Sequence, residues 1–280
     1  MTGGAKMSQP FTAEELRDLQ RAKSLLETRS FAVKLSDLFG LPINAGFALL
    51  PKKWSKKINR AAQAALFKAL EVAVATSGRR GSKPPANRWH KVLAGASGGV
   101  GGAFGLAALA VELPISTTLM LRSIVEIARS EGHDARDWAT KVACLEVFAL
   151  GGSKKAAEPP ELPYWTTRLA LNQSAKEAAS HLARKGAVER TAPALARLIG
   201  AIASRFGVVI SEEVAAKALP VVGAVGGSVI NVVFMNHFQQ MARGHFIVLR
   251  LEKTHGQAAV REQYDALSNG PAPETPPNAI

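Results

Sequence analysis

The chain has 280 residues, of which 47% are hydrophobic and 20% charged, and its formal net charge is +13. The apolar content excludes disorder of the whole chain, because it is high enough to bury a large core. The single cysteine, Cys144, excludes a disulfide scaffold and argues against a thiolate zinc site. Met1 to Pro10 contains no apolar stretch of the kind found in secretory signals, so we expect a cytoplasmic protein.

The positive charge is concentrated in the first third of the chain. Residues 1–91 carry 17 basic and 6 acidic side chains, whereas residues 92–280 carry 18 basic and 16 acidic ones. Between Pro51 and Lys91, eleven basic side chains accompany a single acid, Glu71. Such a block predicts adsorption to an anionic partner, either a phospholipid surface or a nucleic acid.

Apolar periodicity and capping signals predict an all-α chain, and no segment indicates a convincing strand. Thr12 and Glu15 form a capping-box pattern, Gly132 is a natural helix C-cap, and Pro114 either begins a new helix or kinks a continuing one. We expect a multi-helix bundle of roughly nine helices. They are predicted over 13–29, 52–77, 92–111, 114–131, from Asp134 or Asp137 to Leu150, and over 164–185, 192–206, 212–219, 218–254 and 257–267.

One helical domain is predicted over 13–267. It consists of a basic subregion, 13–91, and a Gly-rich helical core, 92–267. The flanking segments 1–12 and 268–280 are expected to be disordered, the second because it is rich in proline. Further breaks are predicted at the loops 78–87 and 151–163, and within 38–51, an uncharged segment that Gly40, Pro42 and Gly46 interrupt and that is too short to span a bilayer.

Two apolar segments, 92–111 and 218–242, are rich in glycine at four-residue spacing. Residues four apart share a helix face, so these glycines would let two backbones approach closely. The segments are predicted either to form a central buried seam or to insert into lipid. The missing GK[ST] sequence argues against a phosphate-binding loop. The predicted packing glycines are Gly95, Gly98, Gly99, Gly101, Gly102, Gly105, Gly223 and Gly227.

The start of the second predicted helix is basic and amphipathic. Lysines and an arginine recur at three- and four-residue spacing beside a tryptophan, a pattern typical of helices that lie in a membrane interface. A solvated face over a core helix is the alternative interpretation. Nucleic acid is disfavoured, because aromatic residues make up only 6% of the chain and no zinc-finger, RRM or KH pattern is present. The predicted membrane-binding residues are Lys52, Lys53, Trp54, Lys56, Lys57 and Arg60.

Several charged side chains interrupt the apolar helices. We interpret them as a structural ion-pair network, in which Arg122 and Glu126 have the spacing to pair on one face. The network would contain Glu112, Arg122, Glu126, Arg129 and Glu146. The alternative is convergence of Glu112, Glu126, Glu146 and His237 on a metal or a hydrolytic site. The ExxH spacing of di-iron bundles is missing there, and neither GxSxG nor HExxH occurs, so no metal or cofactor is predicted.

The run from Glu112 to Gly152 resembles the signature region of the EcsC family, together with the Gly-rich segment before it. Pro220 to Gly256, followed by Tyr264, resembles the family's second block, and the likeness covers about residues 20–267. One departure is Gly132-His133-Asp134, where members often carry an acidic pair after the glycine. The resemblance implies a bacterial protein whose namesake accompanies an ABC transporter, and it supplies no catalytic residues.

These observations favour a non-enzymatic, membrane-associated helical protein. It would adsorb to anionic lipid through the basic helix, peripherally or partly inserted at the cytoplasmic membrane, and could serve an ABC transporter subunit or an envelope process. Two alternatives stay open: a hydrolase or metal-dependent enzyme built on the Glu/His cluster, and a soluble adaptor that uses an exposed helix face.

Overall fold

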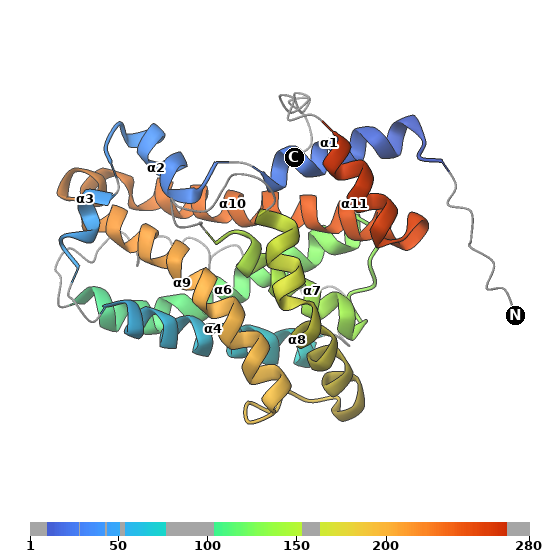
Figure 1. Cartoon of the computed structure of the whole chain (residues 1–280). Coiled ribbons are helices and arrows are strands. Elements are labelled where there is room, and N and C mark those ends of the chain that lie inside the picture. Colours follow the sequence, from blue (N-terminus) through green and yellow to red (C-terminus); the bar gives the residue numbers. More distant parts are fainter. Residues whose placement is uncertain are drawn as a thin grey trace, which may run out of the picture.

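The structure is a computed structural model that describes residues 10–27, 29–42, 44–50, 54–76, 104–152 and 163–267. Over these ranges it contains ten helices and no strand, which confirms the predicted fold class (Figure 1). The helices are α1 (Ala13–Leu26), α2 (Phe31–Phe39), α3 (Asn44–Phe47), α4 (Trp54–Thr76), α6 (Phe104–Ser130), α7 (Trp138–Leu150), α8 (Pro163–Lys185), α9 (Pro193–Ala218), α10 (Pro220–His255) and α11 (Gln257–Ala266).

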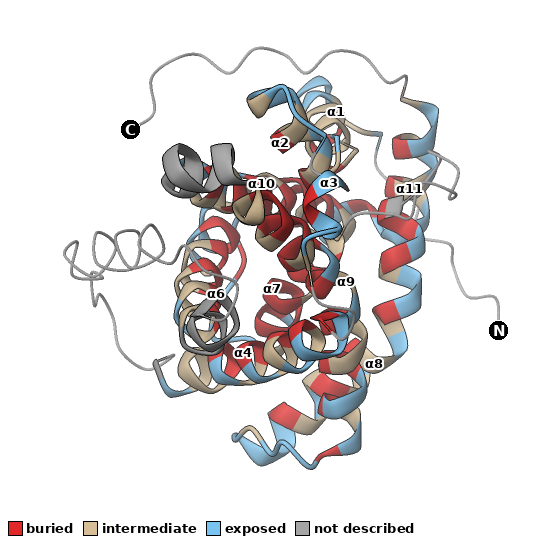
Figure 2. Ribbon diagram, turned by 90° about the vertical axis from the view of Figure 1, so that its left-hand side faces the viewer, coloured by how far each residue is buried: buried red, intermediate tan, exposed pale blue. Residues whose placement is uncertain are grey.

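Helix α7 is the centre of the bundle. Residues 140–145 and 147–149 are buried, so the helix is covered on every side. It contacts α4, α6, α8, α9 and α10, which surround it in the end-on view of Figure 2. Phe148 of α7 meets Phe206 of α9 and Phe238 of α10, with ring centroids 4.8 and 5.5 Å away. These rings join the apolar face of each long helix into one core.

The helix ends follow the predicted local signals. Thr12 and Glu15 form the reciprocal capping box, with the Glu15 amide donating to Thr12 Oγ1 and the Thr12 amide to Glu15 Oε2. Gly132 has φ of +79°, and the amides of Gly132 and His133 donate to the carbonyls of Arg129 and Ala128. This is the Schellman pattern, which glycine favours because it carries no β-carbon. Asp137 is the N-cap of α7 without a side-chain capping bond.

One predicted helix break matches an alternative left open by the sequence, and another differs from the structure. Pro114 lies inside a continuous α6, which corresponds to the predicted continuing helix. Gly207 was expected to separate two helices, yet α9 runs through it from Pro193 to Ala218. At Gly207 the helix crosses α4, where an added β-carbon would lie 3.6 Å from Ile58 Cγ2. Packing between α4 and α9 therefore holds the helix together at a residue of low intrinsic helix propensity.

Close backbone approach occurs at glycines other than those predicted. A β-carbon added to Gly46 would lie 2.1 Å from the carbonyl oxygen of Ala215, and one added to Gly244 would lie 2.6 Å from Leu26 Cγ. These glycines seat α3 on α9 and α1 on α10. Of the predicted packing glycines, 95, 98, 99, 101 and 102 lie outside the described residues, and Gly105, Gly223 and Gly227 are helical.

One end of the bundle gathers several chain segments. Helices α2 and α3, the starts of α4, α6 and α10 and the end of α9 lie at the left of Figure 1, and Figure 2 shows this end facing the viewer. Phe31 of α2 stacks edge-on against Phe234 of α10, at 5.4 Å. Residues 1–9 and 268–280, predicted to be disordered, lie outside the described ranges, whereas Phe11 stacks on His255 at 4.0 Å.

Candidate functional site

The first turns of α4 present a cationic face to solvent. Lys56, Lys57 and Arg60 are exposed, and none of the three forms an ion pair with another described residue. The predicted Lys52 and Lys53 lie outside the described ranges. These positive charges are therefore free to meet an anionic surface.

Trp54 does not belong to this face. Its side chain is 7% exposed and is part of the core, with Ile58 one turn further along α4. The prediction that Trp54 lies at a membrane boundary is therefore wrong for this structure. Residues 54 and 58 are four apart, so they point to the same, inward side of the helix as Ala62.

Glu71, the acid nearest in sequence to this face, already forms ion pairs with other basic side chains. Glu71 accepts from Arg190 Nε at 2.7 Å and lies 3.9 Å from Lys68 Nζ. The hydrogen bond with Arg190 lowers the pKa of Glu71, which keeps the carboxylate charged. Glu71 thus neutralises charge at the far part of α4 and leaves the first turns positive.

The predicted ion-pair network is divided among separate sites. Glu112 lies 3.9 Å from Lys217, which also bonds Glu213 at 2.6 Å and links the start of α6 to the end of α9. Glu126 pairs with Arg129 at 2.6 Å on the exposed side of α6. Arg122 is half-buried on the same helix. Glu126 thus pairs with Arg129, another member of the predicted network, three residues further along the helix.

Glu146 lies inside the bundle beside a buried histidine. Its Oε2 is 3.8 Å from Nε2 of His245, whose Nδ1 is 3.0 Å from the hydroxyl of Tyr164. Burial lowers the pKa of His245 well below its usual value, so the imidazole is neutral. Burial also raises the pKa of Glu146 to about 7, which the nearby Arg168 opposes. The group ties α7, α8 and α10 together.

A second buried pair lies next to this group. Arg168 of α8 donates to both carboxylate oxygens of Glu252 on α10, at 2.6 and 3.0 Å. The two side chains are 14% and 11% exposed, so water screens the pair weakly. Tyr164, His245 and Glu146 have the order of a hydroxyl, a base and a carboxylate, but Tyr164 is 3% exposed and its pKa is raised by burial. The Tyr164 hydroxyl is therefore protonated and buried in the core.

His237 is also engaged in the core. Its Nε2 is 2.8 Å from the carbonyl oxygen of Gly151, which can only accept, so Nε2 carries the proton. Nδ1 then accepts from Lys34 Nζ at 3.4 Å, and Lys34 also donates to Gln240 at 2.9 Å. Burial lowers the pKa of His237 to about 4 and that of Lys34 to about 8.

The four residues of the metal or hydrolase alternative are not brought together as a site. Glu126 is on the surface, Glu146 and His237 have separate core partners, and Glu112 pairs with Lys217. Within the described ranges, no group of three His, Cys, Asp or Glu side chains could hold a metal ion. Cys144 is buried, and burial raises the pKa of its thiol.

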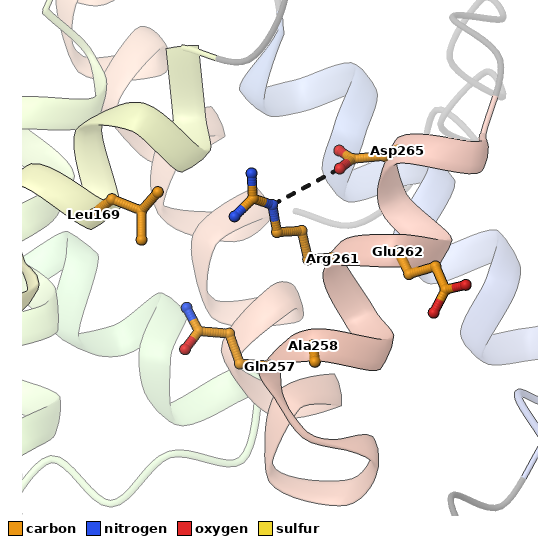
Figure 3. A pocket seen from close by; sticks show the side chains of 6 residues that line it. All are labelled: Leu169, Gln257, Ala258, Arg261, Glu262 and Asp265. Carbon is orange, nitrogen blue, oxygen red and sulfur yellow. Dashed lines mark ion pairs between the residues drawn. The ribbon is translucent and has the colours of Figure 1, made fainter.

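An open groove lies between α8 and α11. It is lined by Leu169 of α8 and by Gln257, Ala258, Arg261, Glu262 and Asp265 of α11, and Figure 3 shows Leu169 across from Arg261. Arg261 Nε lies 3.8 Å from Asp265, so its charge is partly compensated within the same helix. The groove is shallow and contains none of the predicted site residues.

Helix α9 has the length and apolar composition of a membrane span. In the described part of the chain it is the one helix long and apolar enough to cross a bilayer, with a mean hydropathy of 1.6 over its most apolar window. Half of that window is buried inside the protein, against α3, α4, α7, α8 and α10. A core helix of a soluble bundle passes the same test, so length and composition alone do not make α9 a membrane span.

The described architecture is that of an all-α bundle built around one buried helix. The model of the EcsC protein family matches residues 13–251, which is most of the chain. The chain therefore belongs to the EcsC protein family. No curated protein and no solved structure matches it.

Proposed function

We propose that this protein binds anionic phospholipid surfaces peripherally, through the cationic face of α4. The observation that supports it is the set of three exposed basic side chains, Lys56, Lys57 and Arg60, without ion pairs to described residues. A basic residue close to an anionic leaflet contributes about 1 kcal/mol, so three give reversible binding that salt weakens. Residues 38–70 contain no Asp or Glu, so no acid from this part of the chain competes with lipid for the basic side chains.

The direct test is charge reversal at these positions. The variant Lys56→Glu, Lys57→Glu, Arg60→Glu should float with phosphatidylcholine–phosphatidylglycerol vesicles at least about tenfold less than the unmodified protein. A matched control reverses three exposed cations elsewhere, Arg17→Glu, Lys176→Glu and Arg184→Glu, with the same change in net charge. The control variant should retain most of the binding, because its altered residues lie on α1 and α8.

Two outcomes would contradict the proposal. Equal loss in both variants would mean that net charge, and not the α4 face, controls binding. Association with native membranes but not with protein-free vesicles would favour the adaptor alternative, in which a transporter subunit or another membrane protein is the partner.

A further inference from the structure

The α2–α3 segment, which precedes α4 in the chain, exposes large apolar side chains. Leu38 is 51% exposed and Leu49 58% exposed, with Leu41 and Phe47 between them. No charged residue occurs from Leu38 to Leu50. Single exposed apolar residues are ordinary on protein surfaces, whereas a concentration within twelve residues marks an interaction surface.

The segment is held firmly by its inner face. Phe31 and Leu35 are fully buried, and Gly46 sits against the backbone of Ala215 so closely that no β-carbon fits. Gly40 ends α2 with φ of +64°, which turns the chain toward α3. The apolar side chains are thus displayed from a fixed backbone, because the inner face is already packed against α9 and α10.

Exposed apolar side chains also occur on α6 and α10. Ile115 is 45% exposed in the first half of α6, and Val229 and Val232 are 41% and 52% exposed in the first half of α10. The starts of α6 and α10 lie at the left of Figure 1, at the end of the bundle that carries α2 and α3. Gln239 bonds Ser123 at 2.8 Å and His133 bonds the carbonyl of Phe246 at 3.0 Å, so α6 and α10 run in the same direction.

We infer that this apolar end inserts into the headgroup–acyl boundary of an anionic bilayer, with α2–α3, which precedes the lysines of α4 in the chain, as a shallow hydrophobic anchor; this rests on the proposed function. The charge pattern selects lipid as the occupant. From Leu38 to Leu70 the sequence contains no acid, and Asp37, just before this range, is paired with Arg29 at 2.7 Å. The apolar segment precedes Lys56, Lys57 and Arg60 in the chain. Apolar side chains flanked by cations suit a surface that is negative outside and apolar beneath.

The buried cysteine allows a specific test of insertion. Cys144 is 1% exposed, so in Leu49→Cys the added thiol is the one a maleimide dye can reach. An environment-sensitive dye there should brighten and shift to the blue on phosphatidylcholine–phosphatidylglycerol vesicles. The same dye at Lys176→Cys on α8 should not respond, and the unmodified protein should take up no dye.

Removal of the apolar side chains provides the second arm. Leu38→Ser, Phe47→Ser, Leu49→Ser should weaken vesicle binding on the order of tenfold and abolish the part that resists salt. Leu169→Ser, an exposed leucine on α8, should bind as before. Circular dichroism should show the same melting behaviour for the triple variant, because each altered side chain is exposed.

Three results would overturn the inference. Vesicle-bound protein with an unchanged dye at position 49 would leave the electrostatic proposal standing and remove insertion. A dye response that grows with protein concentration without vesicles would identify a second copy of the chain as the occupant. Failure of the unmodified protein to bind vesicles would remove the proposed function and the anchor together.

Discussion

Glu146, whose side chain is 13% exposed, and the buried His237 are residues whose protonation changes stability in opposite directions. The pKa of Glu146 is raised to about 7, so between its unfolded value of 4.5 and 7 the native state binds more protons than the unfolded state. The stabilisation of the native state that Glu146 provides at low pH is therefore lost as the pH rises through that window. The pKa of His237 is lowered from 6.5 to about 4, so its contribution is lost as the pH falls through that window.

In the variant Glu146→Gln, the pH dependence of stability that His237 causes should remain without the opposing contribution of Glu146. Between about pH 5 and pH 8 its unfolding free energy should rise relative to that of the unmodified protein, by roughly 1–3 kcal/mol, because the glutamine cannot ionise. Urea denaturation at both pH values measures this difference. Parallel pH profiles for the two proteins would mean that Glu146 titrates normally in the native state.

A loss of the His237 hydrogen bonds should destabilise the protein. His237→Phe would leave the carbonyl of Gly151 without its buried donor and remove an acceptor from Lys34. The expected decrease in unfolding free energy is about 1–3 kcal/mol. Chemical denaturation gives the value, and a variant as stable as the unmodified protein would show that the imidazole bonds contribute nothing net.

At the scale of elements, close approach between helices depends on particular glycines. Gly244→Ala would place a β-carbon 3.0 Å from the backbone oxygen of Ala22, so α1 must move away from α10. We expect a loss of about 1–3 kcal/mol in unfolding free energy. Gly200→Ala on α9, where an added β-carbon meets nothing within 4 Å, should instead stabilise by about 0.5–1 kcal/mol. The same effect from both variants would contradict the packing role of Gly244.

Local signals in the sequence predicted helix ends well where the responsible atoms are close in the chain. The Thr12–Glu15 capping box and the Gly132 turn are examples, since both bond within a few residues. Predictions failed where contacts between residues distant in the chain determine whether a helix forms or continues. Gly207 suggested a break, but packing on Ile58 keeps α9 continuous, and α2 was not predicted because its helix depends on burial of Phe31 and Leu35.

At the scale of the whole molecule, the sequence identified the cationic helix but not its orientation. Spacing placed Lys56, Lys57 and Arg60 together, and the structure leaves them exposed. Spacing alone could not show that Trp54 faces the core, because which side of α4 is buried depends on α6 and α9. The apolar end could not be predicted from the sequence either, since it is formed by helices distant in the chain.

Fractionation of cells that produce the full chain tests the central claim of peripheral lipid binding most directly. The account predicts that the protein sediments with membranes, that high salt releases part of it by screening the α4 cations, and that alkaline carbonate releases the remainder, because α9 is a core helix. Retention through carbonate would contradict the account by placing a helix across the bilayer. A protein found wholly outside the membrane fraction would contradict it as well.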